Sequence, residues 1–181
     1  MEVVVIKSSY WQRLHNHEKR MFFWCNHVIS HTFLDRTFGL LTHMGGAMFT
    51  IIGSLSIALL TSGLWRSAGW QSFAALSASH LVAALIKKKV QRIRPYLALP
   101  HTKVGRNPLK DHSFPSGHTT AIFAVITPFL FISGWLSLTV IPLALMVGLS
   151  RIYLGLHYPS DCIAGCLLGT GSALFIVILS R

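Results

Sequence analysis

Charged side chains are absent from four long stretches of the chain, and this pattern is the first guide to the fold. No acidic or basic residue occurs in residues 39–64, 67–86, 119–150 or 162–180. Each stretch is long enough to enter a lipid bilayer, because a transmembrane helix needs about 20 consecutive, predominantly apolar residues. The sequence therefore predicts an integral membrane protein whose regular structure is all-α.

The third stretch is too long for a single span, since as one helix it would extend roughly 46 Å at 1.5 Å per residue. We expect Ser133 and Gly134 to turn a tight hairpin between two short helices. The predicted fold class is therefore an all-α membrane bundle of about five transmembrane helices. They are expected near residues 39–61, 68–86, 118–133, 135–150 and 161–180.

Between Lys7 and Arg36 the chain instead mixes aromatic and aliphatic side chains with basic ones. This pattern is typical of an amphipathic helix that lies in the membrane interface. The apolar run ahead of Lys7 is too short for a cleaved signal peptide. We therefore expect a single membrane domain over residues 1–181, with an interfacial helix at 7–36 and a transmembrane core at 39–181.

Hydrophobic residues make up 52% of the chain and charged residues only 12%, which argues against a soluble enzyme. The charge that remains is unbalanced, with 16 Lys and Arg against 5 Asp and Glu. With five spans, every basic residue except Arg66 and Arg181 falls on one membrane face. That distribution indicates an anionic partner at this face, and the apolar stretches argue against a nucleic-acid binder.

The second apolar stretch ends in a basic cluster that contains Lys87 and Arg94 and stops at Pro95. If the helix continues to Pro95, the seven-residue spacing places Lys87 and Arg94 on one face. A lysine and an arginine that converge in this way can hold a phosphate, Arg as a planar fork and Lys as a point charge. The alternative is a cationic helix end that grips lipid headgroups, which is what we expect of the neighbouring Lys88, Lys89 and Arg92.

The third apolar stretch begins with Pro115, Ser116, Gly117 and His118. Proline and serine are typical of a helix start, and glycine allows close approach to the backbone. The N-terminus of a helix presents free N–H groups and the positive end of its dipole, which together favour an anion. His118 in the first turn can act there as an acid or a base, although a lone histidine is also common as a structural polar residue.

The last polar loop contains Arg151, His157 and Asp161. Asp161 begins an apolar helix, where a carboxylate is costly unless it is paired. His157 can donate one ring N–H to this carboxylate and keep the other nitrogen as a nucleophile. The alternative is a helix-capping aspartate beside an incidental histidine. Arg151 adds a third cation on the same face of the membrane.

Together these residues supply what phosphoryl transfer through a phosphohistidine requires, which is mainly positioning and charge stabilisation. They also form three motifs, K-x6-R-P, P-S-G-H and S-R-x5-H-x3-D, in that order. On these motifs the chain resembles the type-2 phosphatidic acid phosphatase superfamily of integral membrane lipid phosphatases. The resemblance covers about 75 residues directly, and it implies an active phosphatase that needs no metal and no other cofactor.

The resemblance also implies a role for each motif residue. His157 is then the nucleophile, Asp161 orients it, and His118 protonates the leaving alkoxide and afterwards activates water. The phosphate oxygens are then held by Lys87, Arg94, Ser116, Gly117 and Arg151.

A membrane lipid phosphate is the implied substrate and the phospholipid bilayer the implied surroundings. Gly117 stands where members that act on undecaprenyl pyrophosphate often have Asp. We therefore expect a lipid phosphomonoester, phosphatidylglycerol phosphate or phosphatidic acid, with undecaprenyl pyrophosphate as the alternative. A membrane scaffold or transporter with a degenerate phosphatase core is the non-enzymatic alternative.

Two arguments bear on which side of the cell membrane carries the active face, and they disagree. The excess of Lys and Arg on this face favours the cytoplasm by the positive-inside rule. The resemblance to enzymes that act on outward-facing lipids favours the outside. The charge argument has the greater weight here, and the sequence leaves the oligomeric state open.

Overall fold

Every regular element in the described part of the chain is a helix or helical turn, as the sequence predicts. The computed structural model describes residues 9–104 and 108–180, with side chains from Gln12 onward. In chain order the elements are α1 (Ser9–Phe23), a π-helical turn η1 (Trp24–Val28), α2 (Thr32–Leu41), a 3-10 turn η2 (Thr42–Gly45), α3 (Ala47–Leu60), α4 (Gly63–Val90), α5 (Pro95–Ala98), α6 (Gly117–Ile126), a 3-10 turn η3 (Thr127–Phe131), α7 (Gly134–Tyr153) and α8 (Pro159–Leu179).

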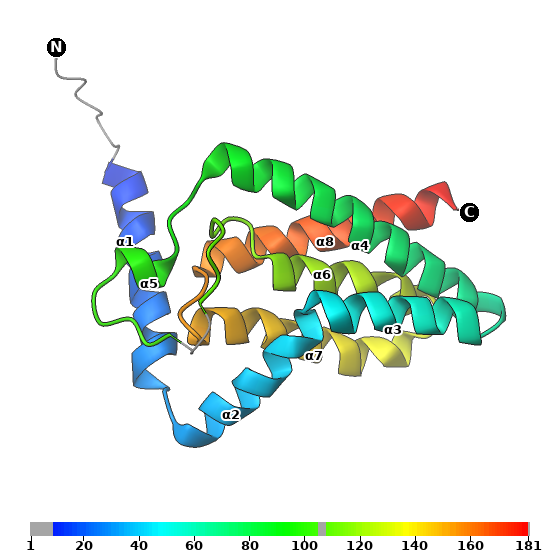
Figure 1. The fold of residues 1–181 in the computed structure, drawn as a ribbon, viewed down its shortest axis with the longest axis horizontal. Coiled ribbons are helices and arrows are strands. Elements are labelled where there is room, and N and C mark those ends of the chain that lie inside the picture. Colours follow the sequence, from blue (N-terminus) through cyan, green and yellow to red (C-terminus); the bar gives the residue numbers. More distant parts are fainter. Residues whose placement is uncertain (1–8, 105–107, 181) are drawn as a thin grey trace, which may run out of the picture.

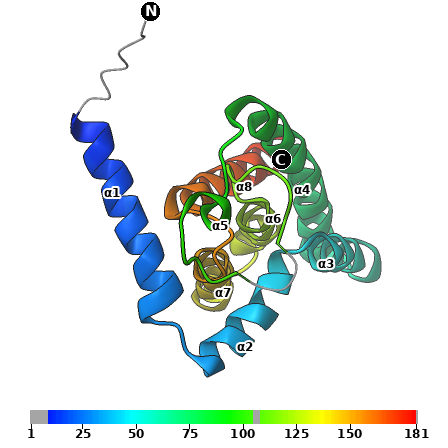
Figure 2. The ribbon, with the colours of Figure 1, turned by 60° about the vertical axis from the view of Figure 1, so that its left-hand side comes forward.

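Helices α3, α4, α6, α7 and α8 run side by side, and α6 lies at the centre of the bundle (Figures 1 and 2). α6 contacts α4, α7 and α8, which explains why most of its side chains are buried. α8 approaches α6 closely at Gly169, where an added Cβ would lie 2.3 Å from the carbonyl oxygen of Thr120. Small residues at such contacts are the usual means of close helix packing in membranes.

Two of the predicted spans, α7 and α8, are long and apolar enough to cross a membrane. The predicted hairpin turn is confirmed, because α7 begins at Gly134 directly after Ser133. α6 and η3 together form a shorter apolar helix over Gly117–Phe131. α4 is 28 residues long but is not among the helices that meet the same criterion.

The helix predicted near residues 39–61 is not continuous in the structure. The region divides between the end of α2, η2 and α3, and the two apolar halves meet at a bend of 53°. The break falls at Gly46, whose extended backbone precedes the first residue of α3. Taken together the bent pair makes a third apolar segment of sufficient length.

The prediction of a single interfacial helix at 7–36 is wrong, and Lys7 lies outside the described residues. The helical structure is interrupted at His31, whose backbone is extended and whose Nδ1 accepts a hydrogen bond from the Phe33 N–H at 3.2 Å. This cap begins α2 in a new direction. α1 stands apart beside the end of the bundle in Figure 2, and Phe22 anchors it in a cluster with Ile152 and Cys162.

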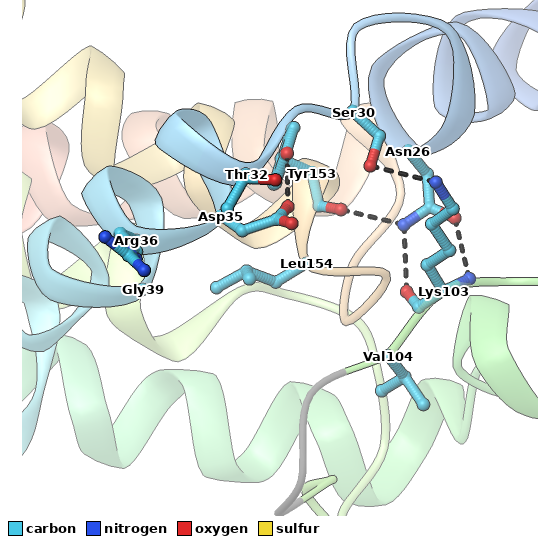
Figure 3. A pocket seen from close by; sticks show the side chains of 10 residues that line it. All are labelled: Asn26, Ser30, Thr32, Asp35, Arg36, Gly39, Lys103, Val104, Tyr153 and Leu154. Atoms are coloured by element: carbon cyan, nitrogen blue, oxygen red, sulfur yellow. Dashed lines mark hydrogen bonds between the residues drawn. The ribbon is translucent and has the colours of Figure 1, made fainter.

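The segment between α1 and α2 is tied to the bundle by polar contacts, shown in Figure 3. Asn26 donates to the carbonyl oxygens of Tyr153 at 2.7 Å and Lys103 at 2.9 Å, and it accepts from the Lys103 N–H at 2.9 Å. Asp35 accepts from the Tyr153 hydroxyl at 2.5 Å. These contacts line one side of a surface cavity of about 880 Å³ and fix the N-terminal helices to the end of α7 and to the loop after α5.

Candidate active site

The three predicted motifs meet at one end of the bundle, where α4 ends and where α6 and α8 begin (Figure 1). A cavity of about 380 Å³ lies there. Five of the eight predicted site residues line it, namely Lys87, Arg94, Gly117, His118 and His157. The other three, Ser116, Arg151 and Asp161, are buried behind its wall.

Lys87 and Arg94 converge, but not through the helical spacing that the sequence suggested. α4 ends at Val90, and Gln91 has a left-handed backbone with φ of 49°. Arg94 is therefore beyond the helix, with an extended backbone directly before α5. The expectation of one continuous helix to Pro95 is wrong, and a bend of the chain after α4 brings the two cations to the same carboxylate instead.

Both cations bind the carboxylate of Asp111. The Lys87 ammonium donates to Oδ2 at 2.7 Å, and Nη2 of Arg94 donates to Oδ1 at 2.6 Å. Burial opposes ionisation of Asp111, but the hydrogen bonds and charges of Lys87 and Arg94 outweigh it and lower the pKa to about 2. An anion is therefore bound by these two side chains at neutral pH.

Arg94 also reaches the predicted nucleophile. Its guanidinium is 1% exposed, and Nη1 donates to the carbonyl oxygen of Leu156 at 2.8 Å. The same nitrogen lies 3.1 Å from Nε2 of His157. Because arginine is only a donor, this contact requires a lone pair on Nε2. The proton of a neutral His157 then belongs on Nδ1, on the side of Asp161.

His157 and Asp161 lie side by side in the protein interior. His157 Nδ1 is 3.6 Å from Asp161 Oδ2, slightly beyond hydrogen-bond distance. Burial is the main cause that lowers the pKa of His157 to about 4; the neighbouring Asp161 opposes this shift, and Arg94 and Arg151 add to it. At neutral pH the imidazole is therefore uncharged, as a nucleophile must be.

Asp161 is held by donors on both carboxylate oxygens. Oδ1 accepts from Arg92 at 2.6 Å. Oδ2 accepts from the Ser113 hydroxyl at 2.5 Å and from the Tyr158 N–H at 2.8 Å. The contact with Tyr158 caps α8. The two alternatives for Asp161, helix cap and partner of His157, are thus combined in one side chain.

The remaining predicted residues line or support the start of α6. Ser116 is its N-cap, and its N–H donates to the carbonyl oxygen of Asp161 at 3.0 Å, which joins α6 to α8. A Cβ on Gly117 would meet nothing within 4 Å, so a ligand has room at the first turn. Arg151 donates from Nη1 to the Thr42 hydroxyl at 2.6 Å, and its buried Nε has no hydrogen-bond partner within the described residues.

Sequence reasoning missed the residues that hold this set in place, and Arg92 was wrongly assigned to lipid headgroups. Arg92 lies within the first motif and Ser113 shortly before the second, so their positions offered a signal. Glu18 and Thr42 come from the N-terminal region, and only the scarcity of acidic residues pointed to Glu18.

The chain is similar to several proteins of known name over part of its length. It is 45% identical over 86 residues to the bacitracin transport permease protein BcrC of Bacillus licheniformis, a match that covers 46% of this chain and 41% of that protein. It is 33% identical over 105 residues to the lipid A 1-phosphatase of Rhizobium etli, with coverages of 56% and 45%. The chain thus spans less than half the length of these two relatives.

A longer match, 27% identical over 157 residues, is to phosphatidylglycerophosphatase B of Bacillus subtilis and covers 78% of this chain and 73% of that one. The fold is similar to the crystal structure of Aquifex aeolicus LpxE, with a TM-score of 0.80, 21% identity and coverages of 88% and 94%. The family model of the PAP2 superfamily matches residues 68–181, which include all three motifs. The chain belongs to the PAP2 superfamily.

Proposed function

We propose that this protein is a membrane lipid phosphatase that hydrolyses a lipid phosphomonoester through a phosphohistidine intermediate, without a metal or other cofactor. The observation that carries the proposal is the convergence of Lys87, Arg94, His118 and His157 on one cavity. Asp161 lies behind His157, on the side of the ring away from Arg94. A nucleophile, a second histidine and an anion site are thereby combined in one place.

In the first step of this mechanism, Nε2 of His157 attacks phosphorus and forms an N–P bond. The P–O bond to the lipid breaks, and His118, which takes up a proton when the anionic phosphate binds beside it, gives that proton to the leaving alkoxide. The attack leaves a positive charge on the ring of His157, which the carboxylate of Asp161 stabilises at close range. In the second step His118 takes a proton from water, the water oxygen attacks phosphorus, the N–P bond breaks, and inorganic phosphate leaves.

The phosphate oxygens are held by Lys87, Arg94, Arg151 and the start of α6 at Ser116 and Gly117. In this arrangement the substrate phosphate replaces Asp111 on the first two cations. The short distance of 3.1 Å between Arg94 Nη1 and His157 Nε2 supports this, because a phosphate oxygen bound to Arg94 brings phosphorus beside the attacking nitrogen.

We propose a glycerolipid monophosphate as substrate, either phosphatidylglycerol phosphate or phosphatidic acid. The open space at Gly117 leaves the backbone at the start of α6 accessible to the phosphate. Of the three sequence relatives compared above, the one matched over the longest stretch is named as a phosphatidylglycerophosphatase. Undecaprenyl pyrophosphate is the alternative, and the same cavity then binds the terminal phosphate.

We further propose that residues 1–181 form one membrane domain with five spans, formed by α2 and α3 together, α4, α6 with η3, α7, and α8. The side-by-side arrangement of α3, α4, α6, α7 and α8 supports this (Figure 1). The excess of basic residues supports a cytoplasmic active face. In a chain without its native cysteines, an impermeant thiol reagent applied to intact cells then labels Ser62→Cys and leaves Thr102→Cys unlabelled. Labelling at position 102 contradicts this orientation.

The activity is tested by phosphate release from purified protein in detergent with EDTA present. Phosphatidylglycerol phosphate, phosphatidic acid and undecaprenyl pyrophosphate are compared at equal surface concentration. We expect release from the two monophosphates, loss of release in His157→Asn, and full release in His101→Asn, a control at an exposed loop residue. Activity that disappears with EDTA and returns with a divalent ion contradicts the proposal, as does normal turnover by His157→Asn.

A further inference from the structure

Arg92 does not contact the cavity, but it faces the start of α8. Its Nη1 donates to Asp161 Oδ1 at 2.6 Å and to the Ser160 hydroxyl at 2.7 Å. The guanidinium also lies over the ring of Tyr158, 4.0 Å from the ring centroid. With a side-chain exposure of 23%, Arg92 is fixed by the protein and not free to follow lipid headgroups.

The contact with Arg92 determines how the carboxylate of Asp161 is oriented. Ser113 and the Tyr158 N–H both bind Oδ2, which is the oxygen that faces His157. Arg92 is the donor that the structure gives for Oδ1. Donors on both oxygens prevent rotation of the carboxylate and keep Oδ2 beside the imidazole. Arg92 also supplies the positive charge that a fully buried carboxylate needs.

Glu18 of α1 holds Arg92 from the other side. Its Oε2 accepts from Arg92 Nη2 at 2.7 Å. Its Oε1 accepts from the Ser160 N–H at 3.1 Å and from the Ser160 hydroxyl. Glu18 therefore binds both the cation and the first turn of α8, where a carboxylate also interacts favourably with the helix dipole.

These contacts form a continuous series from Glu18 through Arg92 and Asp161 to His157. Glu18 lies in α1, outside the residues 68–181 that match the family model. We propose that Arg92 and Glu18 are positioning residues that hold Asp161 in the orientation His157 requires, and that α1 is thereby part of the catalytic unit. This inference rests on the phosphohistidine mechanism proposed above.

The charges around His157 define a pH readout for this role. The imidazole faces Asp161 from α8, Arg94 from the segment before α5, Arg151 from α7 and His118 from α6. Arg92 acts on it through Asp161. When Arg92 is neutralised, Asp161 attracts the proton of His157 more strongly, so the acid limb of kcat/KM moves to higher pH, by about one unit.

The test compares Arg92→Gln, Arg92→Lys and Glu18→Gln with Lys89→Gln, which removes a charge from an exposed residue of the same basic cluster. We expect kcat of Arg92→Gln to fall about 100-fold and that of Glu18→Gln about 10-fold, which is the range seen when the hydrogen-bond partners of metal-binding residues are removed in metal sites. Arg92→Lys recovers part of kcat because it keeps the charge. KM and the inhibition constant of inorganic phosphate stay within about two-fold, since the phosphate ligands are unchanged.

An unchanged kcat and pH profile in Arg92→Gln overturns the inference, and so does an equal loss in Lys89→Gln. If Arg92→Gln does not fold, Arg92→Lys and Glu18→Gln decide the matter by the same readouts, and wild-type values in both overturn it. Failure of the proposed function is a different result, because there the wild-type protein itself releases no phosphate in EDTA or retains turnover in His157→Asn.

Discussion

The carboxylate of Asp111 binds Lys87 and Arg94, the two cations that the proposed mechanism assigns to the substrate phosphate. Removing the charge of Asp111 should therefore strengthen phosphate binding. Burial raises the pKa of Asp111, but the hydrogen bonds and charges of Lys87 and Arg94 more than offset this, and the pKa falls from 3.8 to about 2. That difference corresponds to about 2.5 kcal/mol in favour of the ionised form. The side chain is 54% exposed, however, and solvent screening reduces the contribution to about 1 kcal/mol.

An incoming phosphate must displace this carboxylate, and about 1 kcal/mol corresponds to about a five-fold change in affinity. We therefore predict that Asp111→Asn lowers the inhibition constant of inorganic phosphate about five-fold at pH 7. Arg94 keeps its place in this variant through the carbonyl oxygens of Asp111 and Leu156. Product inhibition of phosphatidic acid hydrolysis in detergent micelles measures the effect.

The control is Asp35→Asn, which removes the same charge from a carboxylate bound to Tyr153 at the separate cavity of Figure 3. It should leave the inhibition constant unchanged. The ion pair also has a pH signature. Because the folded pKa of Asp111 is below its ordinary value, its contribution to stability is complete above about pH 4 and is lost as pH falls toward 2. An inhibition constant that is unchanged or higher in Asp111→Asn refutes the reasoning, since Asp111 would then orient the cations without competing for them.

Three further predictions concern the support of the site and its pH range. Thr42→Val removes the acceptor that holds Nη1 of Arg151, and kcat/KM should fall about 10-fold, in line with a hydrogen bond to a charged group; a steady-state assay with short-chain phosphatidic acid checks this. Gly169→Ala inserts a Cβ 2.3 Å from a backbone oxygen of α6 and should destabilise the protein by about 1–3 kcal/mol, whereas Gly171→Ala, where a Cβ meets nothing within 4 Å, should not; thermal unfolding in detergent separates them, and equal unfolding temperatures contradict the packing argument. Since burial lowers the pKa of His157 to about 4, the nucleophile should remain uncharged from pH 7 down to about 5. The pH profile of wild-type kcat/KM should therefore contain no decrease from protonation of His157 above about pH 5.

The motif spacing located the candidate site, but the local structure around it came from features that the spacing does not contain. The Lys87 to Arg94 interval was interpreted as two helical turns, whereas Gln91 takes a left-handed backbone and ends α4. Residues 87–94 contain no glycine or proline that would indicate this end. The two side chains still converge on Asp111, because a bend after the helix brings together the same residues that a continuous helix face would.

The helical spans were predictable where apolarity is continuous, as in α7 and α8, since period and length are local properties. The bend at Gly46 and the break at His31 depend on how the segments pack and were missed. The contacts that support the site are long-range in the chain. Glu18 and Arg92 are 74 residues apart, and Thr42 and Arg151 are 109 apart. No pattern within one short window reports such pairs, so a single sequence could not identify them.

The central claim is that the phosphoryl group is transferred covalently to His157. Trapping that phosphohistidine tests the claim most directly. Labelled p-nitrophenyl phosphate has a leaving group that needs little protonation, so His118→Asn should form the phosphohistidine and then hydrolyse it slowly. Rapid denaturation in alkali should leave one acid-labile, alkali-stable phosphate on the peptide that contains His157, and none in His157→Asn. Label that is absent from His118→Asn and wild-type protein during turnover, or that persists in His157→Asn, would contradict the account.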